Sequence, residues 1–345
     1  MATRRRAMVV TRSGGPEVMV PKDEPIRDPG AGEVLIEVAF AGVNFADLAA
    51  RAGVYSAAPR PPMVVGFEVS GRVAAVGPGV THVAQGDRVI AVIRFGGYAS
   101  HVVARADSTR KIPDSMTLEH AAAIPVTYAT AWYALVEVAR VRAGESVLIH
   151  AAAGGVGVAA IQLARHLGLE TFGTASTDEK LEFCKKLGLE HGINYSREDF
   201  ARRVRALTAG RGVHLVIDSV GGPILKKSFE SLAVSGMVII IGAADLYPRS
   251  LVGFARTAVE LARMKRFSAF ELIETNRCVA GLQLLLVWDA RGSLGTMFDD
   301  ILALWEKGVV RPVVDQVFPL TAAGEAHRYL ADRRTKGKVL LDAAR

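Results

Sequence analysis

The chain is poor in cysteine, with only Cys184 and Cys278 among its 345 residues. Two cysteines cannot build a disulfide framework, and they cannot supply a zinc site that needs four thiolates. So few thiols suit the reducing cytosol, and we therefore expect a cytoplasmic protein.

Long apolar runs are also missing. No window reaches the ~18 uncharged apolar residues of a membrane span, and residues 279–288, which come nearest, are expected to form a buried helix or strand. The basic start of the chain is followed by a short strand-like segment at residues 7–10, not by the longer apolar core of a signal peptide. With 50% hydrophobic residues, the chain can instead bury sizeable cores, and its length predicts about two domains.

The formal net charge is +7, but the basic residues are dispersed along the chain and form no patch with interleaved aromatic residues. We therefore expect no nucleic-acid partner, since an anionic cofactor needs only a few of these charges. Residues 249–267 alternate apolar and basic positions at helical spacing, a pattern that would suit the surface of an anionic membrane. The expected role of this stretch is packing on its own domain or at a subunit contact.

The order of patterns along the chain predicts two kinds of domain. The first 120 residues contain short alternating runs separated by glycine and proline, which indicate an antiparallel, partly barrel-like β domain. From residue 121 helices alternate with strands, which indicates a doubly wound parallel sheet. A strand, a helix and a last strand follow residue 310 and are expected to return to the first domain. The predicted strands are residues 34–39, 68–76, 88–93, 98–103, 147–150, 170–174, 192–194, 215–219, 237–242, 313–319 and 338–342, and the domains are 1–124, 125–310 and the returning 311–345.

A glycine cluster joins the predicted strand at 147–150 to a helical pattern. It occupies the place of the dinucleotide fingerprint GxGxxG, with alanine at the first glycine position. Because glycine has no Cβ, the backbone can approach a pyrophosphate closely, and the helix that follows presents free N–H groups. The alternative is a tight strand-to-helix turn without a ligand. The residues predicted to bind the pyrophosphate are Ala152, Gly154, Gly155, Val156 and Gly157.

The next predicted strand indicates which dinucleotide binds. A Rossmann sheet that binds NADH has an acidic residue near the end of this strand to hold the ribose diol, and this chain has Ala175 there. Ser176 and Lys180 follow, whereas Asp178 belongs to the first turn of the next helix, where the helix dipole favours acids. A hydroxyl and a lysine suit a 2′-phosphate better than a diol, so we predict NADPH.

Several motifs together resemble the medium-chain dehydrogenase/reductase superfamily over nearly the whole chain. They are AGVNFAD at 41–47, GFEVSG at 66–71, VG at 76–77 with GDRV at 86–89, GGYA at 96–99 and the AAAGGVG turn at 151–157. The resemblance implies an α/β fold with a Rossmann doubly wound parallel sheet and a GroES-like, partly open β-barrel catalytic domain. It also implies that the cofactor lies in the cleft between these two domains.

Three positions identify the branch. Zinc-dependent alcohol dehydrogenases of this superfamily place Cys, His and Cys where this chain has Asn44, Phe67 and Val126, and none of these three side chains offers a thiolate or imidazole. The chain therefore resembles the zinc-independent quinone oxidoreductase branch, which includes zeta-crystallin, with similarity to the synaptic-vesicle membrane transport protein homologues. The resemblance implies a homodimer without a metal, Lys180 and Tyr195 at the adenosine phosphate, and Thr130 beside the nicotinamide.

This branch implies NADPH-dependent hydride transfer to a quinone or an α,β-unsaturated carbonyl compound. An oxyanion would develop on the substrate, so hydrogen-bond donors should gather near its carbonyl, and Asn44 and Tyr55 are the candidates, with Tyr55 or solvent as proton donor. One alternative is a trans-2-enoyl thioester reductase, which shares the fold and cofactor. Another is an NADPH-binding protein of low turnover that acts at membranes or on partners.

Overall fold

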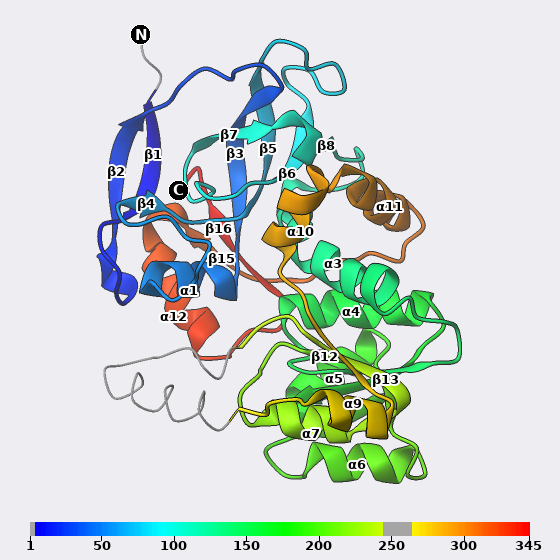
Figure 1. Cartoon of the computed structure of the whole chain (residues 1–345). Helices are drawn as coiled ribbons and strands as arrows, with labels where there is room; N and C mark the ends of the chain where they lie inside the picture. Colours follow the sequence, from blue (N-terminus) through cyan, green and yellow to red (C-terminus); the bar gives the residue numbers. More distant parts are fainter. Residues whose placement is uncertain (1–3, 244–263) are drawn as a thin grey trace. The chain divides into compact units, whose positions relative to one another are not determined.

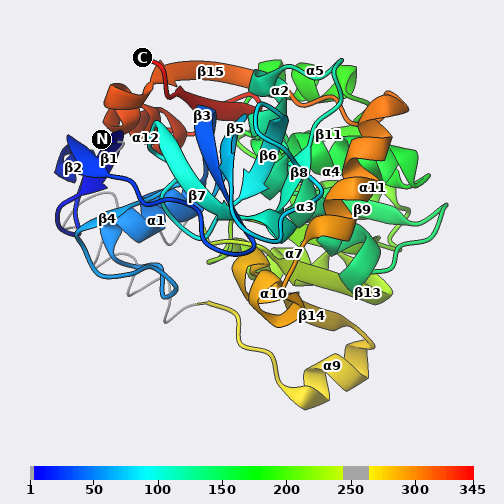
Figure 2. The same ribbon diagram turned by 90° about the horizontal axis from the view of Figure 1, so that it is seen from above.

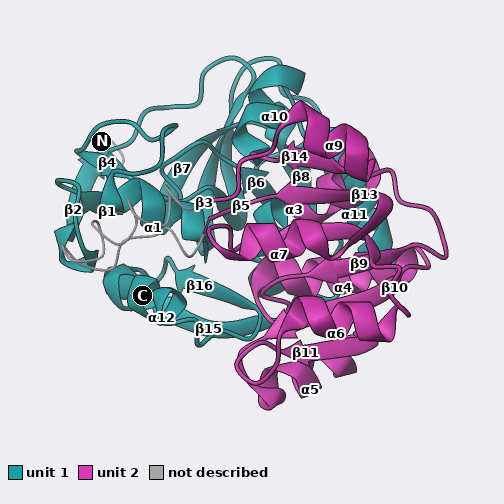
Figure 3. Ribbon diagram, turned by 60° about the horizontal axis from the view of Figure 1, so that its bottom comes forward, with its two compact units in different colours: residues 1–129, 284–345 teal, residues 130–283 magenta. Residues whose placement is uncertain are grey.

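The computed structural model describes residues 4–243 and 264–345, so that residues 249–263 of the basic stretch lie outside the described part. The chain forms two compact units (Figure 3). Unit 1 comprises Met1–Ala129 and Leu284–Arg345, and unit 2 comprises Thr130–Gln283. Both predicted classes of domain are present, an antiparallel β unit and a parallel α/β unit.

Unit 1 contains two sheets and the predicted return of the chain. The small sheet has the order β2-β1-β4, and the larger one runs β15-β16-β3-β5-β6-β8, with β7 paired to β3. The last strand, β16, is antiparallel to β3, and α12 packs on β15 and β16 (Figures 1 and 2). The elements are β1 (Arg4–Val10), β2 (Met19–Pro25), β3 (Glu33–Val43), α1 (Phe45–Ala52), β4 (Met63–Val64), β5 (Glu68–Val76), β6 (Arg88–Val92), β7 (His101–Arg105), β8 (Thr109–Lys111), α2 (Leu118–Ala122), α10 (Leu284–Arg291), α11 (Gly295–Glu306), β15 (Val314–Pro319), α12 (Ala323–Ala331) and β16 (Lys338–Asp342).

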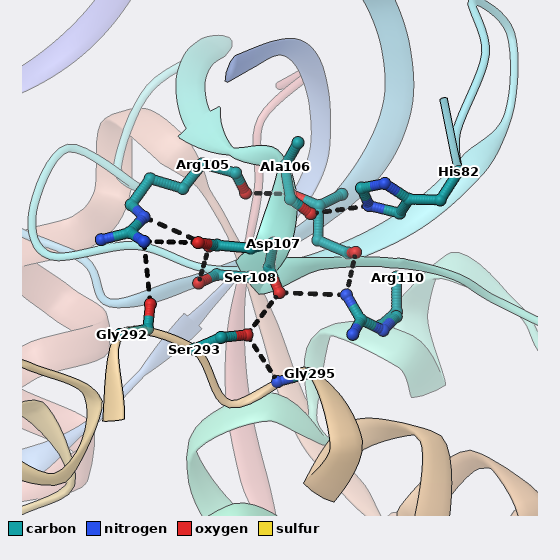
Figure 4. A network of polar contacts seen from close by, with 10 residues as sticks. His82, Arg105, Ala106, Asp107, Ser108, Arg110, Gly292, Ser293 and Gly295 are labelled. Carbon is teal, nitrogen blue, oxygen red and sulfur yellow. Dashed lines mark hydrogen bonds and ion pairs between the residues drawn. The ribbon is translucent and has the colours of Figure 1, made fainter. Parts of the chain in front are cut away.

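The segment from 284 to 310 belongs to unit 1, whereas the sequence places it in the second domain. Its two helices are fixed to the β unit by polar contacts (Figure 4). Arg105 donates to the carbonyl of Gly292 at 2.8 Å, and the Ser293 hydroxyl donates to the carbonyl of Asp107 at 2.8 Å. Arg110 forms an ion pair with Asp299 at 2.9 Å. Because these partners lie far apart in the sequence, local patterns gave no sign of the boundary at 284.

Unit 2 is a single parallel sheet with strand order β11-β10-β9-β12-β13-β14. Its first strand, β9, lies in the middle, with β10 on one side and β12 on the other, as the doubly wound prediction requires. The helix α3 (Pro125–Trp132) carries the boundary between the units. The other elements are β9 (Ser146–Ile149), α4 (Gly155–His166), β10 (Glu170–Ala175), α5 (Asp178–Lys186), β11 (His191–Asn194), α6 (Phe200–Leu207), β12 (Val213–Asp218), α7 (Ile224–Glu230), β13 (Leu232–Ile240), α9 (Ala269–Thr275) and β14 (Cys278–Gly281).

Helices α6 and α7 cover one face of this sheet. The core there is built from apolar side chains of both helices and of successive strands, with Phe172 and Val204 fully buried. Helix α4 packs on β9 and β10. The predicted strands of this sheet overlap the observed ones, and the largest difference is at β13, which begins at Leu232 whereas the prediction begins at residue 237.

Two further predicted elements differ from the structure. The strand predicted at 98–103 is His101–Arg105, because Gly96 has φ +104° and the Tyr98 N–H donates to the Val65 carbonyl, outside the ladder. Residues 279–288 form neither one helix nor one strand, since β14 ends at Gly281 and α10 begins at Leu284. Of the helices described here, none has both the length and the apolar character needed to cross a bilayer.

Candidate functional site

The glycine turn lies at the carboxyl end of the central strand of unit 2. Strand β9 ends at Ile149, and α4 begins at Gly155 with Gly154 as its N-cap. The Ala152 N–H donates to the Thr174 carbonyl at 3.0 Å, which fixes the turn against β10. The parallel strand order reverses direction at β9, and ligands of doubly wound sheets bind at this switch point.

The turn is shaped to receive an anion. A Cβ on Gly157 would lie 2.4 Å from the Ala152 carbonyl oxygen, so only glycine lets α4 approach the turn this closely. The N–H groups of Gly155, Val156 and Gly157 open the helix and have no intrahelical acceptor. The first turn of α4 carries no acidic residue that would repel a diphosphate. The donor set therefore fits a dinucleotide diphosphate.

The residues predicted for the adenosine end gather where β10 and β11 end. Ala175 is the last residue of β10, as predicted, and its carbonyl accepts the Tyr195 N–H at 3.1 Å. The backbone of Ser176 is tied to the segment after β11 by the Ser196 hydroxyl at 3.0 Å. Lys180 lies in the first turn of α5, where its N–H donates to the side chain of the N-cap Thr177 at 3.3 Å. A carboxylate for a ribose diol is missing at the strand end, at Ala175.

The sequence interpretation missed Arg197 at this end of the sheet. Its guanidinium forms an ion pair with Asp178, which also accepts from the Asn194 side chain at 2.6 Å. The Arg197 side chain is 72% exposed and follows Tyr195 by two residues. It adds a second cation to the segment that carries Tyr195, while Asp178 opens α5 as predicted.

Thr130 is buried in the last turn of α3, at 9% exposure, and is the first residue of unit 2. A π-helical turn, Tyr133–Val138, continues the helix. The π-helical turn is wider than an α-helical one, and such turns occur often at functional sites. The role of Thr130 at the nicotinamide stays a prediction.

In unit 1, strand register brings Asn44 together with two residues far away in the sequence. Strand β3 ends at Val43, which is paired with Val339, so that Lys338 stands beside Asn44. On the other side of β3, Ala41 is paired with Val69, which puts Glu68 beside Gly42. A Cβ on Gly42 would lie 2.3 Å from the Glu68 Oε1 atom, so glycine at this position makes room for the carboxylate.

Asn44, Glu68 and Lys338 form a closed triangle of polar contacts, which we call the Lys338 triad. The Lys338 ammonium lies 2.5 Å from Glu68 Oε1 and 2.5 Å from Asn44 Oδ1. The Asn44 Nδ2 atom donates to Glu68 Oε1 at 2.8 Å. The second carboxylate oxygen of Glu68 accepts the N–H of Val126, near the start of α3, at 2.7 Å. The side chains of Lys338 and Glu68 are 4% and 0% exposed, so the ion pair is buried.

A second carboxylate, Asp47, lies just behind the triad. It accepts the Asn44 N–H at 2.7 Å and the Gly66 N–H at 2.9 Å. Burial raises the pKa of Asp47 to about 7, against the opposing effects of the Asn44 N–H and the Lys338 charge. Asp47 thus closes the start of α1 and holds the backbone of Asn44 in place.

Tyr55 belongs to a cluster of aromatic rings next to the triad. Its ring packs edge-on against Phe67, the residue before Glu68, with centroids 5.9 Å apart. Phe67 also packs on Phe95 at 5.0 Å. The Phe67 ring therefore lies between Tyr55 and the backbone of Glu68. The rings of Tyr55, Phe67 and Phe95 together form an apolar wall in this part of unit 1.

Glu68 and Lys338 were not predicted as site residues. Glu68 follows Phe67, a position singled out by the family pattern, and this adjacency was the available signal. Lys338 opens the last predicted strand, and only the pairing of that strand with β3 reveals its partner.

A separate buried chain of hydrogen bonds lies in unit 2. His150 Nδ1 is 2.9 Å from the Thr174 hydroxyl, and His150 Nε2 is 3.0 Å from the Ser228 hydroxyl, which donates to Asp218 at 3.0 Å. Asp218 also accepts the N–H groups of Val220 and Gly221, the local turn bonding expected of a carboxylate at a strand end. Burial lowers the pKa of His150, an effect partly opposed by the charge of Asp218.

The lowered pKa of His150 predicts a loss of stability in acid. In the unfolded chain His150 takes up a proton below about pH 6.5, whereas the folded chain resists it. The unfolded state then binds more protons, so the free energy of unfolding decreases as the pH falls through this window. Urea unfolding at pH 7.5 and pH 5.5 should show a smaller decrease for His150→Gln than for the wild type. An equal decrease in both proteins would show that His150 does not titrate in this way. The contributions of the other buried titratable groups to this decrease cancel in the comparison, because both proteins contain these groups.

Zinc ligands are lacking at the three positions that the family pattern marks. Asn44, Phe67 and Val126 carry an amide, a phenyl ring and an isopropyl group, and the Lys338 ammonium contacts Asn44 and Glu68. A cation this close would repel a metal dication. In residues 4–243 and 264–345, moreover, there is no group of three or more His, Cys, Asp or Glu side chains suited to hold a metal ion. The donor set therefore does not fit zinc.

Comparison with known proteins places both units in families. Residues 30–114 match the alcohol dehydrogenase GroES-like domain, and residues 155–284 match the zinc-binding dehydrogenase family. The human synaptic vesicle membrane protein VAT-1 homolog is 36% identical over 343 residues, which cover 97% of this chain and 86% of that protein. A 2-haloacrylate reductase of a Burkholderia species is 36% identical over 351 residues, covering 97% of this chain and 98% of that enzyme.

Solved structures agree with these matches. The Escherichia coli quinone oxidoreductase in complex with NADPH is 31% identical and superposes with a TM-score of 0.87, covering 98% of this chain and 99% of that one. The identities, the coverage and the shared fold all point to one superfamily. The chain belongs to the medium-chain dehydrogenase/reductase superfamily.

Proposed function

We propose that this protein is an NADPH-dependent, zinc-independent reductase of quinones or of α,β-unsaturated carbonyl compounds. The observation that carries the proposal is the Lys338 triad, in which an ammonium contacts Asn44 and Glu68 at the place where zinc-dependent relatives bind their metal. Support also comes from relatives that are named as a quinone oxidoreductase complexed with NADPH and as a 2-haloacrylate reductase.

We assign the cofactor to unit 2. The open N–H groups of Gly155, Val156 and Gly157, with the close approach at Ala152 and Gly154, would hold the diphosphate. Ser176, Lys180 and Tyr195 would hold the 2′-phosphate, and Thr130 would contact the nicotinamide. The bound cofactor supplies a hydride.

In unit 1, Asn44 would stabilise the negative charge that develops on the substrate carbonyl. Its amide donates a hydrogen bond without becoming charged, which suits an oxyanion. The carbon–carbon double bond of an enone gains the hydride at its β-carbon and a proton at its α-carbon, and we propose Tyr55 or solvent as the source of that proton. Tyr55 lies in the apolar wall with Phe67 and Phe95, which would receive the hydrocarbon part of the substrate.

Changing Lys180 to alanine should weaken NADPH binding about 10- to 100-fold and leave NADH binding nearly unchanged. The ammonium forms a charge-assisted hydrogen bond that only the extra phosphate can accept, and such bonds contribute about 1.5–3 kcal/mol. Fluorescence titration of both cofactors measures the ratio of the two affinities.

The matched variant is Ala175→Asp, which supplies the missing carboxylate at the end of β10. It should move the preference toward NADH, because an aspartate can hold the ribose diol and repels a phosphate. Equal losses of NADPH and NADH in Lys180→Ala, or an unchanged preference in Ala175→Asp, would reject the assignment of the 2′-phosphate site.

The reaction type is tested by following NADPH absorbance against five substrates: 1,4-benzoquinone, 9,10-phenanthrenequinone, an alkyl enone, crotonyl-CoA, and an alcohol run backwards with NADP⁺. Turnover with the quinones or the enone is the expected result. Turnover with crotonyl-CoA alone would favour an enoyl thioester reductase. Oxidation of the alcohol alone, or no turnover with any of the five, would reject the proposal.

We also propose that the protein is a cytoplasmic homodimer. Strand β14 is an edge of the parallel sheet, and α9 next to it exposes Phe270 at 78% and Ile273 at 74%. Exposed apolar groups beside an edge strand suit a second copy of the same chain. Cys184 and Cys278 are both free thiols, which agrees with a reducing compartment. Light scattering coupled to gel filtration measures the mass in solution.

A further inference from the structure

We infer that Lys338 and Glu68 are positioning residues that fix the Asn44 carboxamide so that one N–H of its Nδ2 atom is presented to the substrate. The inference rests on the proposed function, because it needs Asn44 to act on the substrate carbonyl. It goes further by assigning a role to two residues that the family pattern of zinc ligands does not include.

The orientation of the Asn44 amide follows from the chemistry of its two neighbours. An ammonium can only donate a hydrogen bond, and an ionised carboxylate can only accept one. Asn44 Oδ1 must therefore face Lys338, at 2.5 Å, and Nδ2 must face Glu68, at 2.8 Å. The flipped amide would place its NH₂ group against the ammonium and its oxygen against the carboxylate, with two repulsive contacts in a buried site.

This orientation leaves one hydrogen of Nδ2 for another acceptor. A primary amide nitrogen carries two hydrogens, and Glu68 takes one of them. Among residues 4–243 and 264–345, Asn44 Nδ2 has no second acceptor. The bond from Lys338 to Oδ1 also withdraws electron density from the amide, and hydrogen bonds that are linked in this way strengthen one another. The triad thus prepares a fixed, polarised donor.

The fold holds the triad by three separate elements. Asn44 follows β3, Glu68 opens β5, and Lys338 opens β16, while the Val126 N–H fixes the second oxygen of Glu68. A buried ion pair is weak support for stability, because desolvation offsets much of the attraction between its charges. The buried ion pair of Lys338 and Glu68 is better explained by the fixed geometry that it gives to the Asn44 amide.

A purely structural role would tie β16 to β5 without acting through Asn44, and a double-mutant cycle separates the two roles. The variant Lys338→Met/Glu68→Gln removes both charges together, so that neither residue is left as an unpaired buried ion. With 1,4-benzoquinone and NADPH, we expect kcat to fall at least tenfold while the Kd for NADPH is unchanged. In an Asn44→Ala background, the same pair of substitutions should cost less than threefold, because residues that act through Asn44 lose their effect with it.

A spectroscopic readout tests the amide itself. The chain contains three asparagines, Asn44, Asn194 and Asn276, so that labelling with ¹⁵N-asparagine gives three side-chain NH₂ pairs, and Asn44→Ala identifies one of them. In the wild type, the chemical shifts of the two Asn44 NH₂ protons should differ widely, because one of these protons faces a carboxylate. In Lys338→Met/Glu68→Gln, this difference in chemical shift should become smaller. The NH₂ signals of Asn194 and Asn276 should keep their chemical shifts.

The outcomes are distinguishable. If Asn44→Ala lowers kcat but Lys338→Met/Glu68→Gln retains wild-type kcat or an unshifted Asn44 pair, the positioning role is wrong and the proposed function stands. An equal loss in both backgrounds also overturns the role, because it identifies a structural tie. If Asn44→Ala itself leaves kcat unchanged, the proposed action of Asn44 fails, and the positioning role fails with it.

Discussion

Changing Asn44 to alanine is expected to lower kcat by about 10²- to 10³-fold, the usual loss when one donor to a developing oxyanion is removed. The affinity for NADPH should stay within about twofold, since the residues assigned to the cofactor lie in unit 2 and Asn44 lies in unit 1. Steady-state kinetics with 1,4-benzoquinone and a fluorescence titration with NADPH measure the two quantities separately.

The matched variant is Asn44→Asp, which has nearly the same shape and lacks the NH₂ group. When ionised, it cannot donate to an oxyanion, and we expect a loss at least as large as in Asn44→Ala. Asn44→Asp keeps an oxygen for Lys338 but places a second carboxylate against Glu68, so that its loss combines the missing donor with repulsion between the two carboxylates, and Asn44→Ala alone measures the loss of the donor. Retention of kcat within about threefold in both variants would show that Asn44 does not stabilise the transition state.

Changing Glu68 to alanine should reduce the free energy of unfolding by about 3–5 kcal/mol, the typical cost of removing one partner of a buried ion pair. The Lys338 ammonium, with its side chain 4% exposed, would lose its counterion and could not reach water. The Val126 N–H would lose its acceptor as well. Urea unfolding monitored by tryptophan fluorescence measures the change.

An exposed ion pair of the same unit provides the control. Arg94 and Asp289 are paired at 2.7 Å, with side chains 54% and 41% exposed. Asp289→Ala should cost at most about 1 kcal/mol, because solvent screens exposed charges. If Glu68→Ala cost no more than Asp289→Ala, the carboxylate of Glu68 would not be the counterion of a buried lysine.

The sequence predicted the elements whose signal is local. Strands such as β5 and β16 carry short apolar runs bounded by turn residues, and both were placed at their observed limits, Glu68–Val76 and Lys338–Asp342. The turn from β9 into α4 was equally visible, because its glycines stand between an apolar run and a helical pattern. Local patterns sufficed wherever the interactions that form an element lie within it.

The Lys338 triad could not be predicted in the same way. The contact between Asn44 and Lys338 joins residues 294 positions apart, and it exists because Val339 is paired with Val43 in antiparallel register. A shift of one residue would turn Lys338 to the other face of the sheet. The boundary at residue 284 was missed for a related reason, since it depends on contacts such as Arg110 with Asp299.

We propose that this chain reduces its substrate with NADPH and with an ammonium, not a zinc ion, beside Asn44. The most direct test is the rate of 1,4-benzoquinone reduction by NADPH after exhaustive dialysis against a chelator, with the zinc content of the same sample measured by elemental analysis. We expect an unchanged rate and far less than one zinc per chain. Stoichiometric zinc before dialysis, with a rate that disappears on its removal and returns when zinc is added, would contradict it.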